Sequence, residues 1–300
     1  PSLLRAAPKF SGAPRATRVA AMSSAAPASG SLSFAPGAAC ELIVVRHGET
    51  EWNKELRVQG STDIELNAKG RLQAERCAEA ISERLAKRGA AFPPAVWSSH
   101  LSRAAVTASA IAAGVGSDEG VRQDARLAEW DLGVLEGMRK DEAAQKHAED
   151  WWTFSHHWAA PVVADDVASR VISGGESMLE VRRRVVACLE EACREALVVG
   201  RSTVVAVTHG GALGQVLKHA VSQLAADEVP ATASPTNACI STFYVEPSGR
   251  WHIAAWAEAD HLTGDAAPLV ANYNAASSCA EEAKAEEKPE EMPAAVAVEQ

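Results

Sequence analysis

The segment Leu42-Ile43-Val44-Val45-Arg46-His47-Gly48-Glu49 joins an apolar run to a charged turn that contains a histidine. Its first four residues lack the alternation of polar and apolar side chains that a half-exposed strand shows. Such a run predicts a β-strand buried on both faces, as in a parallel sheet covered by helices. In sheets of this kind, binding sites form beyond the carboxyl ends of the strands, which is where Arg46 and His47 lie.

Strand-like and helix-like segments alternate outward from this run as far as residue 274. Helical segments carry apolar residues three or four positions apart, and Gly89 and Gly114 end the first two. Pro247-Ser248-Gly249 predicts the turn of a β-hairpin. Predicted helices span residues 67–88, 102–113, 177–199 and 211–226, and predicted strands span residues 42–45, 95–97, 203–207, 240–245 and 251–256. The alternation predicts an α/β fold, a three-layer α/β/α sandwich with a mostly parallel sheet and an antiparallel edge strand.

Charge divides the 300-residue chain into three parts. Residues 1–40 carry four basic residues and no acidic one, and their Ala, Ser and Pro content predicts a disordered segment that resembles an organellar transit peptide. The alternatives are an ordinary disordered N-terminus or sequence upstream of a start at Met22. Residues 275–300, with seven Glu and two Lys, are predicted to be a disordered acidic tail. Residues 41–274 are therefore expected to form one domain.

The composition argues against several classes of protein. A net charge of −10 and a pI of about 5.4 disfavour nucleic acids and anionic membranes as partners. Six scattered cysteines without a CxxC pair indicate reduced thiols inside the cell, not a disulfide framework or a structural metal. The longest uncharged run is rich in Pro, Gly and Ser, so no membrane-spanning helix is predicted. We expect an intracellular protein, in a plastid or another organelle if residues 1–40 are a transit peptide and otherwise in the cytoplasm.

Three predicted strands end in residues that suit an anionic ligand. One is followed by Arg46-His47-Gly48, another by residues 98–103 with Arg103 at their end, and the third by His209-Gly210-Gly211. If these strands are neighbours, two arginines and two histidines converge on one pocket. Guanidinium forks suit phosphate oxygens, and a histidine can serve as nucleophile, acid, base or hydrogen-bond donor near neutral pH. The glycines are expected to let the backbone approach the ligand closely.

These segments, with others in the same order, resemble the motifs of the histidine phosphatase superfamily, whose fold is called phosphoglycerate mutase-like. The resemblance extends over about residues 41–262. The matching segments are residues 46–53, 57–60, 98–108, 126–137, 174–177 and 207–211. Each motif is weak alone, but together, in order and at strand ends, they are specific.

The resemblance implies a role for each of nine residues. His47 would be the nucleophile that becomes phosphohistidine, and Glu129 would protonate the leaving oxygen and later activate water. Arg46, Arg103 and His209 would hold the phosphoryl oxygens and stabilise charge in the transition state. The remaining predicted substrate contacts are Asn53, Gln59, Gly60 and Gly210. No cofactor and no metal is implied, and the expected partner is a small phosphorylated metabolite.

The implied activity is that of a metal-independent phosphomonoesterase, a histidine-type acid phosphatase. Glu136 is an alternative acid, but Glu129 stands at the position that matches the family. A phosphoglycerate mutase would share the first half-reaction. The cofactor-dependent mutases carry Glu-Arg-His-Tyr-Gly in the acid loop, whereas residues 128–133 here read Ala-Glu-Trp-Asp-Leu-Gly. A catalytically idle member that binds phosphorylated ligands is the other alternative, which the complete residue set disfavours.

Residues 151–158 read Trp-Trp-Thr-Phe-Ser-His-His-Trp in a chain with few aromatic residues. They predict either a cap that faces the substrate or a part of the hydrophobic core. The resemblance extends to members that act on phosphoserine, carboxyarabinitol phosphate or phosphoglycerate, and nucleotide and sugar phosphates stay open as substrates. The sequence also leaves the oligomeric state open.

Overall fold

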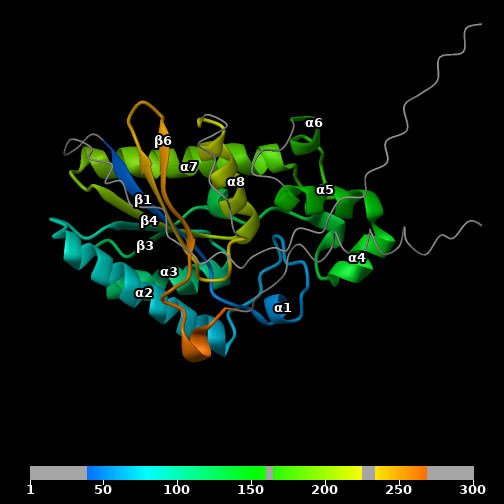
Figure 1. Ribbon diagram of the computed structural model, residues 1–300, viewed down its shortest axis with the longest axis horizontal. Helices are drawn as coiled ribbons and strands as arrows, with labels where there is room; N and C mark the ends of the chain where they lie inside the picture. Colours follow the sequence, from blue (N-terminus) through cyan, green and yellow to red (C-terminus); the bar gives the residue numbers. More distant parts are fainter. Residues whose placement is uncertain (1–38, 160–164, 225–233, 269–300) are drawn as a thin grey trace, which may run out of the picture. The chain divides into compact units, whose positions relative to one another are not determined.

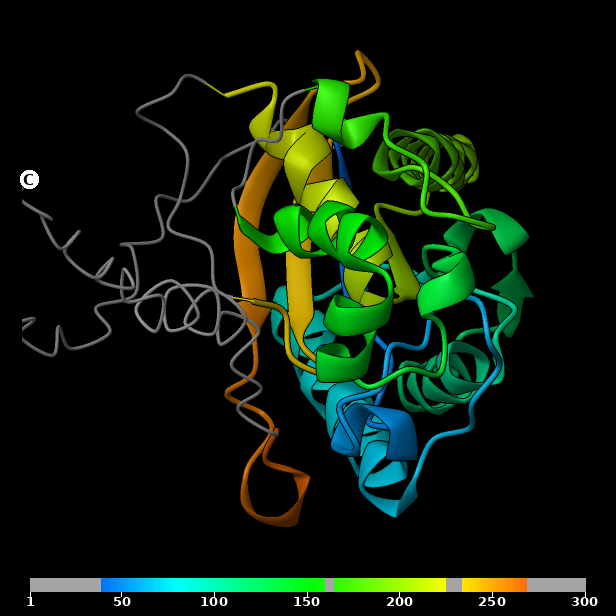
Figure 2. The ribbon, with the colours of Figure 1, turned by 90° about the vertical axis from the view of Figure 1, so that its right-hand side faces the viewer.

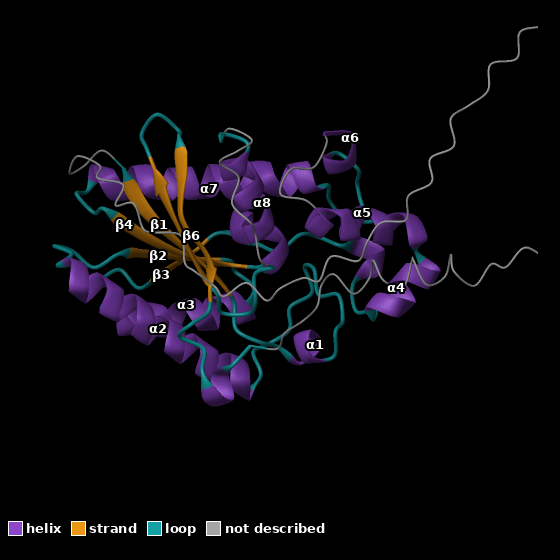
Figure 3. Ribbon diagram, in the orientation of Figure 1, coloured by secondary structure: helices purple, strands orange, loops and turns teal. Residues whose placement is uncertain are grey.

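The computed structural model describes residues 39–159, 165–224 and 234–268, which contain a six-stranded sheet between two layers of helices (Figures 1 and 3). The strands are β1 (Cys40–Arg46), β2 (Ala95–Ser98), β3 (Val121–Gln123), β4 (Thr203–Thr208), β5 (Ile240–Val245) and β6 (Trp251–Glu258). The α-helices are α1 (Glu51–Lys54), α2 (Ala68–Arg88), α3 (Ser102–Gly114), α4 (Lys140–Lys146), α5 (Ala148–Ala159), α6 (Asp165–Ala168), α7 (Met178–Val198) and α8 (Gly210–Val221). Short 3-10 helices are η1 (Ala125–Leu127), η2 (Gly133–Leu135) and η4 (Gly264–Ala266).

The strand order in the sheet is β3-β2-β4-β1-β5-β6. The first four strands are parallel, and β5 and β6 continue the sheet as an antiparallel hairpin. The predicted fold class and the antiparallel edge are therefore confirmed. Since β4 lies between β2 and β1, the three strands that end in predicted site residues are neighbours.

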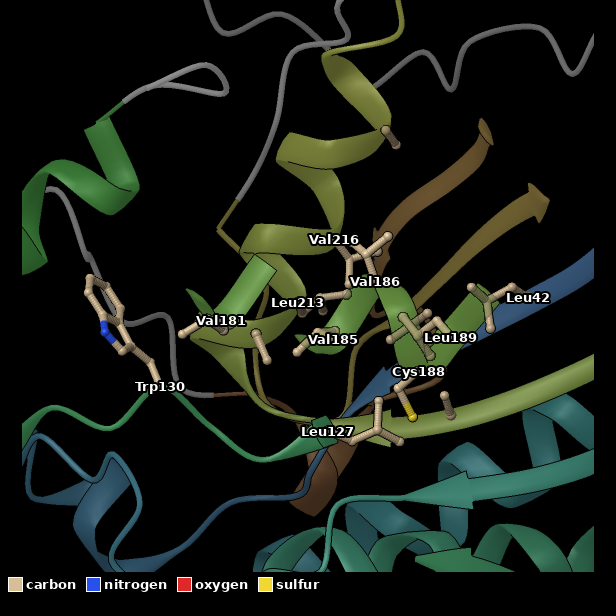
Figure 4. Packing of buried hydrophobic residues seen from close by; sticks show 14 of the residues in the cluster. Leu42, Leu127, Trp130, Val181, Val185, Val186, Cys188, Leu189, Leu213 and Val216 are labelled. Carbon is tan, nitrogen blue, oxygen red and sulfur yellow. The ribbon is translucent and has the colours of Figure 1, made fainter. Parts of the chain in front are cut away.

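The sheet separates two hydrophobic clusters, and β1 contributes alternate residues to both. Leu42 and Val44 pack with α7 and α8, while Ile43 and Val45 pack with α2 and α3. Figure 4 shows the first cluster, in which Leu42 lies among side chains of α7 and α8. A strand that is apolar on both faces thus joins two helical layers, as the unbroken apolar run predicts.

Most predicted helices begin and end within one residue of the observed ones. Asn67 and Ser177 are the N-caps of α2 and α7, and Gly89 ends α2 in the left-handed conformation. Gly114, in contrast, is the last residue of α3 and not a cap. A Cβ on Gly114 would lie 2.9 Å from the Cβ of Ala78, so this glycine permits close packing of α3 on α2.

The structure departs from the sequence predictions at several boundaries. Cys40 belongs to β1, so the domain begins one residue earlier than predicted; the rest of the predicted N-terminal segment except Ala39, and all of residues 275–300, lie outside the described residues. Helix α8 ends at Val221, five residues before the predicted end, and residues 225–226 are not described.

The sequence analysis missed strand β3 and helices α1, α4, α5 and α6. Strand β3 has only three residues and lies at the sheet edge, so it shows no periodicity. Helices α4 to α6 lie beyond the carboxyl ends of the parallel strands, and Figure 2 looks onto this end of the domain, with these helices in green. No helix in the described part of the chain is long and apolar enough to cross a membrane.

Candidate active site

A pocket of about 90 Å³ opens at the carboxyl ends of β1 and β4, beside the loop that leads from β2 into α3. All but one of the predicted site residues line it, namely Arg46, His47, Asn53, Gln59, Gly60, Arg103, Glu129 and Gly210. The exception, His209, is fully buried next to His47, with the two ring centroids 5.0 Å apart. The structure therefore brings residues from distant parts of the chain into one pocket.

His47 directly follows β1 and is almost completely buried. Its Nδ1 lies 2.7 Å from the carbonyl oxygen of Gly48. Because a carbonyl oxygen can only accept a hydrogen bond, Nδ1 carries the proton and Nε2 keeps its lone pair. Burial, together with the charges of Arg103 and Arg46, holds the pKa of His47 well below its usual range, so the ring is neutral at pH 7. This is the nucleophilic form of an imidazole.

His209 has the opposite tautomer. The Nε of Arg103 donates to its Nδ1 over 3.1 Å, so the proton of the neutral ring is on Nε2. Burial and the nearby charge of Arg103 hold the pKa of His209 well below its usual range. Its Nε2 is buried and has no hydrogen-bond partner among the residues that the structure describes. A buried N–H in this position is costly unless it meets an acceptor, such as an anionic oxygen of a ligand.

Both arginines are fixed by backbone carbonyl groups. Arg103 is fully buried, and its two terminal nitrogens donate to the carbonyl oxygens of Gly60 and Thr62, each over 2.7 Å. Burial lowers the pKa of Arg103 to about 10, which leaves it charged at pH 7. Arg46 donates to the carbonyl oxygen of Pro235 over 2.7 Å. Two fixed cations are therefore present in the pocket before any ligand binds.

Glu136 stabilises the loop of residues 60–62, whose carbonyl groups bind Arg103. Its carboxylate accepts hydrogen bonds from the backbone N–H groups of Ser61 (2.7 Å), Thr62 (2.9 Å) and Leu132 (3.1 Å), and from the hydroxyl of Thr62. Glu136 does not line the pocket, whereas Glu129 does. Of the two carboxylates that the sequence offers as an acid, the structure therefore brings only Glu129 to the ligand space.

The Glu129 carboxylate lies at the N-terminus of α8. It accepts hydrogen bonds from the backbone N–H groups of Gly211 (2.9 Å), Ala212 (3.0 Å) and Trp130 (2.9 Å). The free N–H groups and the dipole of a helix N-terminus favour a negative charge at this place. The same helix begins directly after His209, so one element positions both the Glu129 carboxylate and the His209 ring.

Asn53 and Gln59 present their amides to the pocket from the loop after β1. Their side-chain oxygens are both within hydrogen-bond distance of the Thr50 hydroxyl, at 3.1 and 2.9 Å. Asn237 also donates to the side-chain oxygen of Asn53. With the oxygens engaged in this way, the amide nitrogens of Asn53 and Gln59 are the groups that can donate to a ligand.

Three glycines of the site, Gly48, Gly210 and Gly211, lie in close contact with other groups of the protein. A Cβ on Gly48 would lie 2.3 Å from the carbonyl oxygen of Gly70 in α2, and one on Gly211 would lie 2.6 Å from a carboxylate oxygen of Glu129. A Cβ on Gly210 would approach the guanidinium of Arg46 to 3.3 Å. The packing of the protein itself therefore leaves little room for a Cβ at these positions, and Gly210 and Gly211 also line the pocket.

Asn237 is a site residue that the sequence analysis missed. It lines the pocket, and its side-chain nitrogen lies 3.2 Å from the carbonyl oxygen of His47 and 3.3 Å from that of Gly48. The missed signal is its place just before β5. Because β5 is antiparallel to β1, the start of β5 lies at the same edge of the sheet as the end of β1.

The aromatic segment of residues 151–158 forms most of α5 and divides between the two predicted roles. Phe154 lines the pocket, and Trp151 packs on it with ring centroids 5.4 Å apart. Trp152 instead is 39% exposed and stacks on His156. Among the described side chains of this segment, Phe154, and not Trp152, is therefore the one that lines the ligand space. The side chain of Trp158 lies outside the described part.

Within the described residues, no group of three or more His, Cys, Asp or Glu side chains is arranged to hold a metal ion. Four cationic residues line the pocket, namely Arg46, Arg57, Arg103 and Lys140, and of these Arg46 and Arg103 lie beside the two histidines. The arrangement offers a neutral imidazole, a carboxyl group and fixed donors around one small space. These are the groups that transfer of a phosphoryl group requires.

Comparisons with known proteins agree with this chemistry. The family model described as histidine phosphatase superfamily (branch 1) matches residues 42–259. The chain is 34% identical over 226 residues to phosphoglycerate mutase-like protein 4 of Arabidopsis thaliana, an alignment that covers 74% of this chain and 86% of that protein. It is 39% identical over 174 residues to a probable phosphoglycerate mutase of Citrobacter koseri, which covers 58% of this chain and 71% of that one.

Among solved structures, the chain is similar to a mycobacterial glucosyl-3-phosphoglycerate phosphatase whose structure was determined with vanadate (VO3). The TM-score is 0.58 at 26% sequence identity, and the match covers 73% of this chain and 100% of that one. The similarity therefore extends over nearly all of the described domain.

Proposed function

Because the chain belongs to the histidine phosphatase superfamily, we propose that it is a phosphomonoesterase that hydrolyses a small phosphorylated metabolite through a phosphohistidine at position 47. The observation that carries this proposal is the complementary protonation of two adjacent histidines. His47 keeps a lone pair on Nε2, while His209 keeps a proton on Nε2. The first can attack phosphorus, and the second can donate to a phosphoryl oxygen.

In the first half-reaction, Nε2 of His47 attacks the phosphorus atom, and the bond from phosphorus to the leaving oxygen breaks. Arg46, Arg103 and the N–H of His209 hold the other phosphoryl oxygens while charge develops on them. Glu129, in its protonated form, gives its proton to the leaving oxygen, so an alcohol departs. Each preorganised donor of this kind contributes about 10²- to 10³-fold in rate in other enzymes.

In the second half-reaction, water replaces the alcohol. The Glu129 carboxylate takes a proton from this water, whose oxygen attacks the phosphorus atom of the phosphohistidine. The phosphorus–nitrogen bond to His47 breaks, the electron pair returns to Nε2, and inorganic phosphate leaves. Glu129 ends protonated and His47 neutral, so the site returns to its starting state.

Hydrolysis and the mutase reaction differ only in the acceptor of the phosphoryl group. A mutase must retain a bisphosphate while it reorients, which requires further cationic or polar residues beside the acid. Trp130, Asp131 and Leu132 stand where the mutase motif carries Arg, His and Tyr, and the apolar Trp130 and Leu132 line the pocket near Glu129. These apolar residues support water as the acceptor. The relatives that are named phosphoglycerate mutases make the mutase reaction the second candidate.

The test is turnover of a panel of small phosphomonoesters in the presence of a metal chelator. The names of the relatives make 3-phosphoglycerate the first substrate to try, followed by phosphoserine and sugar phosphates. We expect release of inorganic phosphate in chelator, because Arg46 and Arg103 supply the positive charge. His47→Ala is expected to lower kcat by more than about 10³-fold, as for removal of a nucleophile elsewhere. His100→Ala, at an exposed histidine, is the matched control.

A phosphoenzyme that is labile to acid and stable to base, and absent from His47→Ala, would support the proposed intermediate. Isomerisation of 3-phosphoglycerate without release of phosphate would show that the protein is a mutase and not a hydrolase. Loss of activity in chelator would contradict metal independence. Tight binding of phosphorylated ligands without any turnover across the panel would identify a catalytically idle member.

A further inference from the structure

The loop that carries Glu129 has little regular structure of its own, and one side chain of α7 makes several hydrogen bonds to its backbone. Residues 128–132 connect η1 to η2. Arg184 of α7 reaches this loop and donates to the carbonyl oxygens of Arg126 (2.9 Å), Ala128 (2.7 Å) and Glu129 (2.8 Å). Three carbonyl groups in four consecutive residues therefore accept from a single guanidinium.

Glu176 completes the arrangement from the other side. Its carboxylate accepts from Nε of Arg184 over 3.0 Å and from a terminal nitrogen of Arg184 over 2.9 Å. A guanidinium has five N–H groups, and these five hydrogen bonds engage all of them. The side chain of Arg184 is only 20% exposed. Its orientation is thus fixed by hydrogen bonds in every direction in which it can donate.

The segment that contains Glu176 is also attached to the acid loop through its backbone. The indole N–H of Trp130 donates to the carbonyl oxygen of Glu176 over 2.7 Å, and the N–H of Glu176 donates to the carbonyl oxygen of Asp131 over 3.0 Å. A Cβ on Gly175 would lie 2.2 Å from the same Asp131 oxygen. The Gly-Gly-Glu-Ser motif of residues 174–177 therefore lies directly against the loop of the acid.

We propose that Arg184 is a positioning residue for Glu129, and that Glu176 orients Arg184 for this task. The acid is held at two points. Its carboxylate accepts from the N-terminal N–H groups of α8, and its backbone carbonyl accepts from Arg184 of α7. All five N–H groups of Arg184 donate to the protein, so we expect its effect on the leaving group to come through the position of Glu129. This inference rests on the proposed function, because it assigns Glu129 the role of general acid.

The consequence is a dependence on the leaving group. An alkyl phosphate releases a strongly basic alkoxide and needs protonation by Glu129, whereas 2,4-dinitrophenyl phosphate releases a weakly basic phenolate and does not. The ratio kcat/KM includes only the steps up to the departure of the leaving group. A residue that acts through the acid must therefore lower kcat/KM for the alkyl ester selectively. A general acid contributes about 10²- to 10⁴-fold in other enzymes.

The experiment measures kcat/KM of the full chain for an alkyl phosphate and for 2,4-dinitrophenyl phosphate. We expect Arg184→Met to lower the value for the alkyl ester by about 10²-fold and that for the dinitrophenyl ester by only a few fold. Glu129→Gln should show the same selectivity, and adding Arg184→Met to it should cause little further loss. Arg183→Met, at the adjacent exposed arginine of α7, is the matched control.

Equal losses for the two esters would overturn the proposal, because they would show a general structural role for Arg184. Full additivity of Arg184→Met with Glu129→Gln would overturn it as well. If Arg184→Met does not fold, Glu176→Gln provides the same test with a smaller expected selectivity in the same direction. Failure of the proposed function itself is distinguishable, because His47→Ala would then leave turnover of the dinitrophenyl ester unchanged.

Discussion

Arg103 and Arg46 bring fixed positive charge next to two buried histidines, and this charge has a cost for folding. Burial is the largest cause of the lowered pKa of both His47 and His209, and the guanidinium groups lower it further. The folded site therefore keeps both rings neutral over a pH range in which the unfolded chain protonates them. The same feature that keeps the His47 ring neutral thus makes the protein sensitive to acid.

Stability is expected to fall as the pH drops below about 6.5, the ordinary pKa of histidine. In that range the unfolded chain binds protons that the folded site does not, which favours unfolding; above it both states are neutral and the effect vanishes. Each histidine contributes up to about 1.4 kcal/mol per pH unit. His47→Asn and His209→Asn should each make the pH dependence shallower, as measured by urea unfolding between pH 7.5 and 5.

His219 and His261 also have a lowered pKa and contribute to the slope of the wild-type protein. The informative quantity is therefore the difference in slope between each variant and wild type, with His100→Asn as the control for the substitution itself. A variant slope equal to that of wild type would show that the rings of His47 and His209 are protonated in the folded protein.

At the scale of elements, α2 approaches the loop after β1 so closely that a helical glycine is required. A Cβ on Gly70 would lie 2.0 Å from the backbone carbonyl oxygen of Glu49. Gly70 is the third residue of α2, and its N–H donates to the N-cap Asn67. The turn that contains His47 and Gly48 is thus packed against the first turn of a helix.

Gly70→Ala is expected to destabilise the protein by about 1–3 kcal/mol, the usual cost of overpacking. Helix propensity alone predicts the opposite, a gain of about 1 kcal/mol. The sign of the change in a urea titration therefore decides between packing and propensity. We also expect a lower kcat, because the displaced backbone leads directly to His47. Glu75→Ala, at an exposed position of α2, should change stability by less than about 0.5 kcal/mol.

The elements that the sequence predicted well are those with a long periodic pattern or a continuous apolar run. Helices α2 and α7 are each 21 residues long with clear caps, and β1 and β4 are buried along their whole length. Helix α1 has four residues and β3 has three, so neither contains a full period of its pattern. Short elements form because their neighbours hold them, and this information is not local in the sequence.

The site was predictable where it follows parallel strands and not elsewhere. Arg46, His47 and His209 directly follow β1 and β4, so strand ends alone place them together. Asn237 precedes an antiparallel strand. Arg184 lies within helix α7, where sequence reasoning interprets an arginine as a surface residue. Both residues contribute to the site through hydrogen bonds to the backbone of loops that are distant in the sequence. No local sequence pattern predicts such bonds.

At the scale of the whole molecule, the sheet divides the hydrophobic core into two clusters. Ile81 of α2 belongs to one cluster and Leu189 of α7 to the other, and both side chains are fully buried. Side chains on opposite faces of a continuous sheet share few neighbours. Truncations in the two clusters should therefore act independently on the stability of the domain.

Ile81→Ala and Leu189→Ala are each expected to lower the free energy of unfolding by about 2–5 kcal/mol. Their effects should add to within about 0.5 kcal/mol in the double variant. Leu189→Ala combined with Leu213→Ala is the comparison within one cluster (Figure 4), and there we expect a departure from additivity of more than about 0.5 kcal/mol. Urea titrations measure all five variants. Strong coupling between Ile81 and Leu189 would show that the two faces do not act separately.

The position of β4 in the sheet has a consequence for the nascent chain during translation. Strand β4 lies between β2 and β1 in space, yet in the order of synthesis it begins at Thr203, long after β1 ends at Arg46 and β2 ends at Ser98. A nascent chain that ends within α7 contains His47, directly after β1, and Arg103, near the start of α3, but it lacks the strand that lies between β1 and β2. His209 and the α8 amides that hold Glu129 emerge from the ribosome later still. The residues of the site can therefore come together only after translation has passed α8.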